Sequence, residues 1–369
     1  LMREIKILGI IVVIVGVLYW GVEPLAHATF HPEVAKADFE FKDLSHNVDV
    51  SKGNAERGKA LVEANCVACH TLNDVGIAGG DMAVYFRDDK EATIFTPDLS
   101  TAGAIYDEKF LANLIIDPAN TLHLAHKFPN GDFPMTPYVT DGDLNQEVAD
   151  IVAYLKSIGS VSLKKQVLES QEFVAKKGNI ENSTLSEGQK QNEIAKLEES
   201  LTNKATFLNA CSRCHTMKYD GVSSRTTPES LGVYLGSAAP DLSTMIRSKG
   251  EHYLEYFIND PQKVSYKAIQ EAIIKKEGSL PANDKKSEWQ DDKDYSNLAK
   301  ELGVMPVGLS MPRVGLTHEA QERVVAYLES IGDAKKAERE SLGKSLMIFF
   351  GVLSVLAYLW KRRIWSEIH

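Results

Sequence analysis

The sequence predicts a membrane-anchored protein in which one domain occurs twice between two apolar helices. A Cys-x-x-Cys-His motif lies in each half of the 369-residue chain, landmarks after the motifs recur at similar spacing, and an apolar run lies near each end. About 320 residues lie between the runs, which is enough for two domains of ordinary size. The expected parts are an N-terminal anchor and lead-in (1–50), a first domain (51–161), a charged helical linker (162–203), a second domain (204–333) and a C-terminal anchor (334–369).

The four cysteines of the chain are all used in the two motifs, CVACH at 66–70 and CSRCH at 211–215. This order of residues is typical of covalent attachment of c-type haem. Two cysteines three positions apart lie on one face of a short helix and reach the vinyl groups along one haem edge, and the next histidine faces the iron. We expect two covalently bound c-type haems, attached at Cys66, Cys69, Cys211 and Cys214, with His70 and His215 as iron ligands.

Zinc is the alternative for the same residues. His70 and His215 could each complete a Cys-Cys-His set, and the two half-sites could share one or two metal ions. Structural zinc sites rarely place the histidine directly beside the cysteine in both halves. The motifs therefore favour haem over zinc.

Other landmarks repeat together with the motifs. The letters PDLST occur at 97–101 and at 240–244, beginning 27 residues after the first motif histidine and 25 after the second. In both copies an Asp-Pro pair begins 19 residues after the PDLST aspartate, and each half ends in an amphipathic helix, AYLKSIG or AYLESIG. Such agreement over several landmarks indicates a duplicated domain.

Each half resembles class I cytochrome c, which implies an all-α fold wrapped around one haem. The resemblance covers about 51–161 and 204–333. It implies that a methionine in the loop before the last helix of each domain is the second axial ligand. It also implies that a proline carbonyl accepts the other N–H of the proximal histidine and so fixes its ring. The matching residues are Met135 and Met311 for the ligands and Pro97 and Pro240 for the carbonyls.

Other residues compete for the second axial position. Met305, in GVMPVG, is the rival of Met311, although Met311 lies at the family's distance from the helix that begins at GLTHE. His123 and His126 are the rivals of Met135 and would give bis-histidine ligation with a lower potential. The methionine before each last helix is the preferred ligand.

Two polar segments interrupt the repeat. Between the Asp-Pro pair and the candidate methionine lie 16 residues in the first half but 49 in the second. The excess falls in 266–303, which carries many charges of both signs and is expected to be a solvated surface insertion or a docking loop. Segment 163–204 is also polar, with enough Leu, Val and Ile for one or two helices.

The apolar runs predict a membrane anchor at each end. Run 7–22 follows Arg3 and Lys6, and run 346–360 precedes the basic residues 361–363. Each run is slightly shorter than the roughly 20 residues that a bilayer core requires, but flanking aromatic and basic side chains extend the span. We expect one N-terminal and one C-terminal transmembrane helix in contact with membrane lipid.

The flanking charges also predict an orientation. Basic residues outside both runs place both termini in the cytoplasm and residues 23–343 on the other side. Since c-type haem is attached in the bacterial periplasm, we expect a protein of the bacterial inner (cytoplasmic) membrane with periplasmic haem domains. The first run could instead be a signal peptide, because Ala26-His27-Ala28 is an A-x-A cleavage pattern. The net charge of −10 does not suit nucleic-acid binding.

Electron transfer is the function that these features favour. The sequence contains no Gly-rich phosphate loop, and two single helices cannot enclose a quinone site. The C-terminal anchor with its basic tail, and YWGVEPLAH at 19–27, resemble the di-haem cytochrome c subunit of the bacterial quinol-oxidising cytochrome bc complex. The resemblance implies a Rieske iron–sulfur protein as electron donor, cytochrome b as membrane neighbour, and a soluble cytochrome c or terminal oxidase as acceptor. Such a subunit is not catalytic alone.

Two other functions remain open. The di-haem subunit of a haem-copper oxidase has similar haem domains, but it carries its anchor before them and usually none after them. A di-haem peroxidase would require one iron with an open or displaceable sixth ligand. Two low-spin haems of high potential would favour the carrier over the peroxidase.

Overall fold

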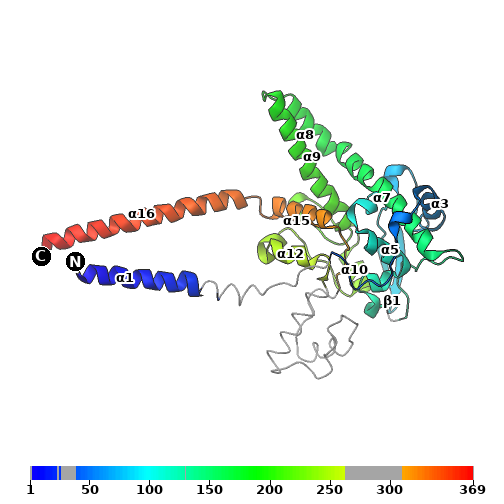
Figure 1. Ribbon diagram of the computed structural model, residues 1–369, viewed down its shortest axis with the longest axis horizontal. Coiled ribbons are helices and arrows are strands. Elements are labelled where there is room, and N and C mark those ends of the chain that lie inside the picture. The colour runs from blue at the N-terminus through cyan, green and yellow to red at the C-terminus, as the bar shows by residue number, and fades with distance from the viewer. Residues whose placement is uncertain (1, 23–24, 26–38, 129, 262–309, 369) are drawn as a thin grey trace, which may run out of the picture.

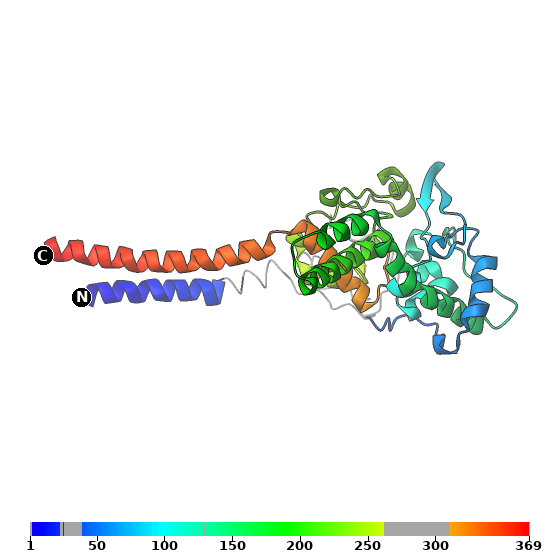
Figure 2. The same ribbon diagram turned by 90° about the horizontal axis from the view of Figure 1, so that it is seen from above.

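Two long apolar helices and a helical body make up the part of the chain that the computed structural model describes, residues 2–22, 25, 39–128, 130–261 and 310–368. α1 (Met2–Val17) and α16 (Lys336–Ile368) run side by side away from the body, and the N- and C-terminal ends lie together (Figures 1 and 2). Near these ends, Lys361 Nζ lies 3.4 Å from Glu4 Oε2. The two expected anchors are thus neighbouring helices.

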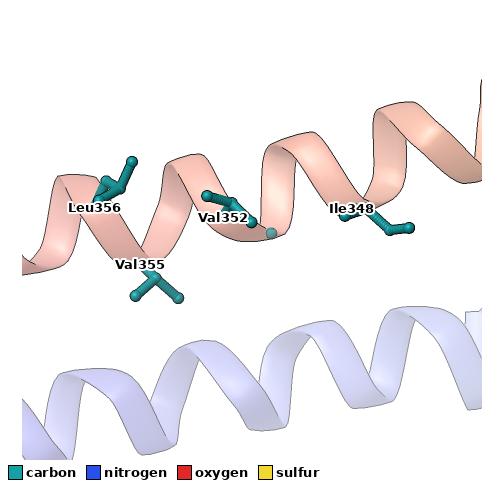
Figure 3. Close-up of a pocket in the computed structure, with 5 residues that line it drawn as sticks. Ile348, Val352, Val355 and Leu356 are labelled. Atoms are coloured by element: carbon teal, nitrogen blue, oxygen red, sulfur yellow. The ribbon is translucent and has the colours of Figure 1, made fainter.

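The surfaces of α1 and α16 are apolar and exposed. Segments Arg3–Val22 and Lys336–Ser366 are long and apolar enough to cross a membrane, and they include both apolar runs of the sequence. A groove on α16 has an apolar lining, from which Val355 points toward α1 (Figure 3). Exposed apolar surface of this kind is typical of helices surrounded by lipid or by other apolar helices. The groove is lined by Ile348, Gly351, Val352, Val355 and Leu356.

The body is built from two halves joined by a helical arm. After α1 and the π-helical turn η1 (Leu18–Val22), the helices of the first half are η2 (Val50–Lys52), α3 (Ala55–Asn65), η3 (Asn73–Val75), α4 (Ala102–Ile105), α5 (Glu108–Ile116), α6 (Pro118–Thr121), η4 (Ala125–Lys127) and α7 (Leu144–Leu168). Those that follow are α8 (Gln171–Glu181), α9 (Glu187–Ala210), η5 (Lys218–Asp220), α10 (Pro228–Leu235), α11 (Met245–Lys249), α12 (Glu251–Phe257) and α15 (His318–Gly332).

Side-chain caps define where the principal helices begin. A polar side chain accepts a hydrogen bond from the backbone N–H three residues ahead, which satisfies one of the free donors of the first turn. These caps are Asn54 for α3, Asp143 for α7, Ser186 for α9 and Thr317 for α15.

In the first half, α3 crosses α7 at very short range. Gly58 makes this possible, because a Cβ atom there would lie 1.9 Å from the backbone oxygen of Asp150. The buried Asp150 carboxylate accepts hydrogen bonds from the backbone N–H of Asn54 at 2.6 Å and from Arg57 Nε at 2.7 Å. The glycine and the ion pair together fix the helix that leads into the first cysteine motif.

In the second half, α9 and α15 pack together in the same way. The rings of Phe207 and Tyr327 lie 4.8 Å apart between their centroids, and both side chains are buried. Tyr327 Oη also donates to Asp220 Oδ2 at 2.7 Å. In each half, therefore, the helix that precedes the cysteine motif packs on the last helix of that half.

A β-hairpin departs from the all-α expectation. β1 (Met82–Arg87) and β2 (Lys90–Phe95) pair antiparallel in the first half, with Tyr85 opposite Ala92. Tyr85 packs into an apolar cluster that includes Leu231 and Leu235 of α10. The expectation of a purely helical fold is thus wrong for these two strands, which gain a buried face by packing on the other half.

The segment between the halves forms a projecting helical arm (Figure 1). α7 continues to Leu168, α8 extends outward to the tip of the arm, and α9 turns back and runs from the tip to the second cysteine motif (Figure 1). A small cluster with Phe173 and Leu201 at its centre holds the base of the arm together. Ser186 and Gln189 form a reciprocal capping box at the start of α9.

Glycine substitutions test the α3–α7 crossing. Gly58→Ala is expected to destabilise the protein by about 1–3 kcal/mol, because the new methyl group collides with the backbone of α7. Gly178→Ala on α8 is the matched control, since a Cβ atom there would have no neighbour within 4 Å, and it should stabilise by up to about 1 kcal/mol. Urea unfolding of the detergent-solubilised protein measures both changes. If the Gly58→Ala and Gly178→Ala variants had the same free energy of unfolding, the close approach of α3 to α7 at Gly58 would be contradicted.

Candidate functional site

The first cysteine motif begins where α3 ends. Cys66 is the C-cap of α3, and its carbonyl oxygen accepts hydrogen bonds from the backbone N–H of Cys69 at 3.1 Å and of His70 at 2.9 Å. These bonds wind the motif into one turn. The turn brings the two cysteines and the histidine to the same end of the helix.

The His70 ring is fixed by the backbone of the PDLST segment. Its Nδ1 lies 2.9 Å from the carbonyl oxygen of Pro97. Because a carbonyl can only accept, Nδ1 carries the hydrogen and Nε2 keeps a free lone pair. Burial lowers the pKa of His70 despite this hydrogen bond, so the imidazole is neutral near pH 7. A neutral ring with a free Nε2 is suited to bind a metal ion.

The second motif has the same geometry. Cys211 is the C-cap of α9 and accepts from the backbone N–H of Cys214 at 3.1 Å and of His215 at 3.0 Å. His215 Nδ1 lies 2.9 Å from the carbonyl oxygen of Pro240. Burial again lowers the pKa of the histidine. The two halves thus present their motif histidines with the same tautomer and the same partner.

Two aspartates stabilise the motifs through hydrogen bonds. In the sequence they were recognised only as repeated landmarks. Asp98 accepts from Thr71 Oγ1 at 2.9 Å and from the backbone N–H of Asn73 at 3.1 Å. In the second half, Asp241 accepts from Thr216 Oγ1 at 3.1 Å, and the backbone N–H of residue 218 donates to it at the same distance. Each carboxylate ties the segment after a motif histidine to the segment that carries the proline carbonyl. Their repetition within PDLST was the signal that could have identified them.

The candidate methionines lie in the expected loops. Met135 is half-buried in the segment that precedes α7, and Met311 is half-buried in the segment that precedes α15. The rival Met305 and the side chain of His126 lie outside the described residues. His123 turns its ring toward a carboxylate, with Nε2 3.1 Å from Asp43 Oδ2.

The surroundings of the motifs suit a large apolar cofactor. Cys66 packs among partly buried apolar side chains, including Val67, Leu99 and Ile115. All four cysteines are free, and burial raises the pKa of the Cys66 thiol to about 11 and that of Cys211 to about 12. The thiols of Cys66 and Cys211 are therefore neutral. Among the described residues, the buried Nε of half-buried Arg213 has no hydrogen-bond partner, so the second motif offers a cationic donor that could bind an acceptor such as a haem carboxylate.

The zinc alternative has no ligand set in the described part of the chain. Among those residues, no three His, Cys, Asp or Glu side chains gather into a group that could hold a metal ion. The Cys and His residues of both motifs belong to that part of the chain. The turn of each motif, with two cysteines and one histidine at the end of a helix, fits a haem attached through two cysteines and bound by one histidine.

The two motifs lie within electrostatic reach of one another. Burial lowers the pKa of His70, and the positive charge of Arg213, in the second motif, lowers it further. Tyr106 is half-buried near the same arginine and near Cys211, and desolvation raises its pKa. A charged side chain of the second motif thus lies near enough to act on the histidine of the first.

Comparison with known proteins identifies the chemistry of the first half. Residues 55–159 match the cytochrome c family, and this region contains Cys66, Cys69, His70, Pro97 and Met135. No curated protein matches the chain. A solved structure, "Hyperthermophilic respiratory Complex III", is similar with 18% identity and a TM-score of 0.27, over 46% of this chain and 77% of that chain. The cytochrome c domain implies covalently bound c-type haem and electron transfer.

Methionine substitutions test the remaining axial positions. Met135→Ala and Met311→Ala are each expected to remove about half of the near-infrared sulfur-to-iron charge-transfer absorption, because each would break one of the two expected thioether–iron bonds. Met305→Ala, the control, should leave the absorption unchanged. If Met305→Ala halved it while Met311→Ala did not, the assignment of Met311 would be wrong.

Proposed function

We propose that the chain is a membrane-anchored di-haem cytochrome c that carries electrons out of a quinol-oxidising cytochrome bc complex. In this role two cytochrome c domains, at 51–161 and 204–333, lie between the anchors at 1–50 and 334–369. Electrons arrive from the Rieske iron–sulfur protein and leave to a soluble periplasmic cytochrome c or a terminal oxidase. Cytochrome b is the proposed neighbour in the inner membrane.

The repeated hydrogen bond between motif histidine and proline carbonyl is the observation that carries this proposal. It measures 2.9 Å in both halves. In both halves it is accompanied by a hydrogen bond from the threonine after the histidine to the PDLST aspartate. A cytochrome c domain covers only the first motif. Because the second motif has the same local geometry, the same chemistry at both motifs is the simplest explanation, and it implies a second haem.

The chain's own residues prepare each motif for one-electron transfer. A bound haem iron would supply that chemistry by alternating between its ferric and ferrous states. Each proline carbonyl holds the proton on Nδ1 of His70 or His215, which directs Nε2 toward the iron position. Met135 and Met311 would complete the axial set, and a methionine ligand raises the potential relative to histidine. Relatively positive potentials suit an acceptor of electrons from a Rieske protein.

The closeness of the motifs supports passage of an electron from one half to the other. Arg213 acts electrostatically on His70 across the boundary between the halves. The β1–β2 hairpin of the first half also packs on α10 of the second half, where Ser230 Oγ accepts from the backbone N–H of Thr93 at 3.2 Å. The halves are thus in direct contact beside their motifs.

Specific features of the chain argue against the oxidase and peroxidase alternatives. An electron-entry subunit of a haem-copper oxidase would not need an apolar helix after the second domain, but α16 is 33 residues long and apolar enough to cross a membrane. A peroxidase would require an open axial position, whereas each half has a methionine before its last helix. We therefore favour the role in the bc complex.

A deletion strain tests the proposed role. Membranes without this chain are expected to lose quinol-driven reduction of c-type haem, because the electron exit is missing, while the oxidase still accepts electrons from an artificial donor. The purified chain alone should show no quinol turnover. Continued reduction of other c-type cytochromes at the normal rate, or co-purification with copper-containing oxidase subunits alone, would favour the oxidase alternative.

A reporter fusion tests the proposed topology. Arg3, Lys6 and the basic residues 361–363 flank the outer ends of the two spans, so both termini are proposed to be cytoplasmic. A periplasm-active reporter fused after His369 should be silent, and the same reporter inserted in the exposed turn at residues 182–185 should be active. Activity after His369 would contradict a spanning α16.

A further inference from the structure

A buried arginine lies two residues after the candidate ligand Met311. The side chain of Arg313 is only 4% exposed, and its Nη1 lies 2.8 Å from Asp43 Oδ2. Its Nη2 lies 3.9 Å from Asp260 Oδ2, and its guanidinium carbon lies 5.7 Å from the centroid of the Phe41 ring. The arginine thus joins the lead-in after the first anchor to the second half of the body.

Asp43 is well suited to hold this arginine. Burial alone would raise its pKa, but hydrogen bonds and charges from His123 and Arg313 lower the pKa well below its ordinary value. The carboxylate is therefore ionised at any physiological pH. Phe41, two residues earlier, is 1% exposed and packs on Phe110 at 5.8 Å between ring centroids, which fixes the lead-in against the first half.

Backbone hydrogen bonds fasten the same segment to the first half. The N–H of Arg313 donates to Leu122 O at 3.1 Å, and the N–H of Thr317 donates to Ile105 O at 3.0 Å. Between them, Gly315 O accepts from the N–H of Asp107 at 3.0 Å. Residues 313–317 of the second half therefore run along the first half.

Gly315 sets how closely this segment approaches. Its φ of +73° favours glycine, and a Cβ atom there would lie 2.2 Å from the ring of Phe110. On the other side, Asn259 exchanges two hydrogen bonds of 2.8 Å with the backbone of Leu316. The segment after Met311 is thus held from both halves, with one close approach that only glycine permits.

Loss of the carboxylate partner would move this segment. A buried guanidinium without its counter-charge is strongly unfavourable, so the side chain would shift toward water or the local backbone would rearrange. Met311 lies only two residues away and would shift with it. A thioether–iron bond depends on a positioned loop, because methionine is a flexible and weakly binding side chain.

We propose that Arg313, held by Asp43 and Asp260, is a positioning residue that keeps Met311 on the iron of the second haem. This inference rests on the proposed function, in which Met311 is the second axial ligand there. It makes the ligation of the second haem depend on the first half and on the lead-in from the membrane anchor. The second haem therefore reaches its high potential only when both parts are docked.

Spectroscopy and redox titration of the purified full chain test the inference. In Arg313→Gln the charge-transfer absorption should fall to about half, because one of two thioether–iron bonds is lost. One of the two midpoint potentials should fall, and one haem should become able to bind added imidazole. Asp43→Asn should have the same effects in weaker form, and Arg313→Lys, which keeps the charge but not the planar fork, should be intermediate.

Two controls separate positioning from general damage. Arg323→Gln removes an arginine of α15 whose partner Glu319, at 2.6 Å, is exposed, and it should change neither haem. The haem of the first half is the internal control, because its absorption and potential should persist in every variant. The content of covalent haem should stay at the wild-type value.

The outcomes distinguish this inference from the proposed function. Retention of the full absorption and both potentials in Arg313→Gln would overturn the inference, and so would equal loss at both haems, since that would mark a general structural role. If Met311→Ala halved the absorption while Arg313→Gln did not, only the inference would fail. If Met311→Ala had no effect, the proposed ligation and the inference would fail together.

Discussion

The hydrogen bond between each motif histidine and a proline carbonyl is the interaction on which the rest of the site depends. It determines which ring nitrogen of His70 and of His215 is free, and it requires the PDLST segment to lie against the end of a helix. The aspartate of that segment holds it there through the threonine after each histidine. The helix before each motif is in turn fixed by its packing on the last helix of the same half. One local constraint thus organises each half around its motif histidine.

The halves are not independent. β2 of the first half packs on α10 of the second, and residues 313–317 of the second half run along the first. The lead-in contributes Asp43 to the same region, so the chain close to the first anchor meets the segment beside Met311. For an electron carrier this has a clear consequence, because separate domains on a flexible linker would not keep two redox centres at a constant distance. Contact between the halves, with α1 and α16 side by side, is consistent with the proposed electron path through two haems at a constant distance.

Local features of the site were predictable from the sequence, whereas contacts between distant segments were not. CVACH and CSRCH indicated the histidines, because haem attachment needs those residues in that order, and the resemblance to class I cytochrome c implied the proline carbonyls of the two PDLST segments. The hairpin was missed although its signal was present: residues 82–86 (MAVYF) form a short apolar run with strand-favouring Val, Tyr and Phe, and it is followed by Asp88 and Asp89, a residue type that tolerates the positive φ both adopt at the turn. The pairing of Arg313 with Asp43 joins residues 270 positions apart. No periodicity or spacing in the sequence predicts such a contact, because the two segments come together only in the folded protein.

The number of covalent haems is the most direct test of this account. The unmodified chain has a mass of 40.8 kDa, and c-type haem stays attached when a protein is denatured because the thioether bonds are covalent. Intact-mass measurement of the denatured chain, purified from cells that attach c-type haem, is predicted to give the polypeptide mass plus two haems. Conversion of Cys211 and Cys214 to alanine should reduce this to one. If the wild-type chain carried a single haem, and the double substitution did not change that number, a second haem site would be contradicted. The proposed electron path through both halves would be contradicted with it.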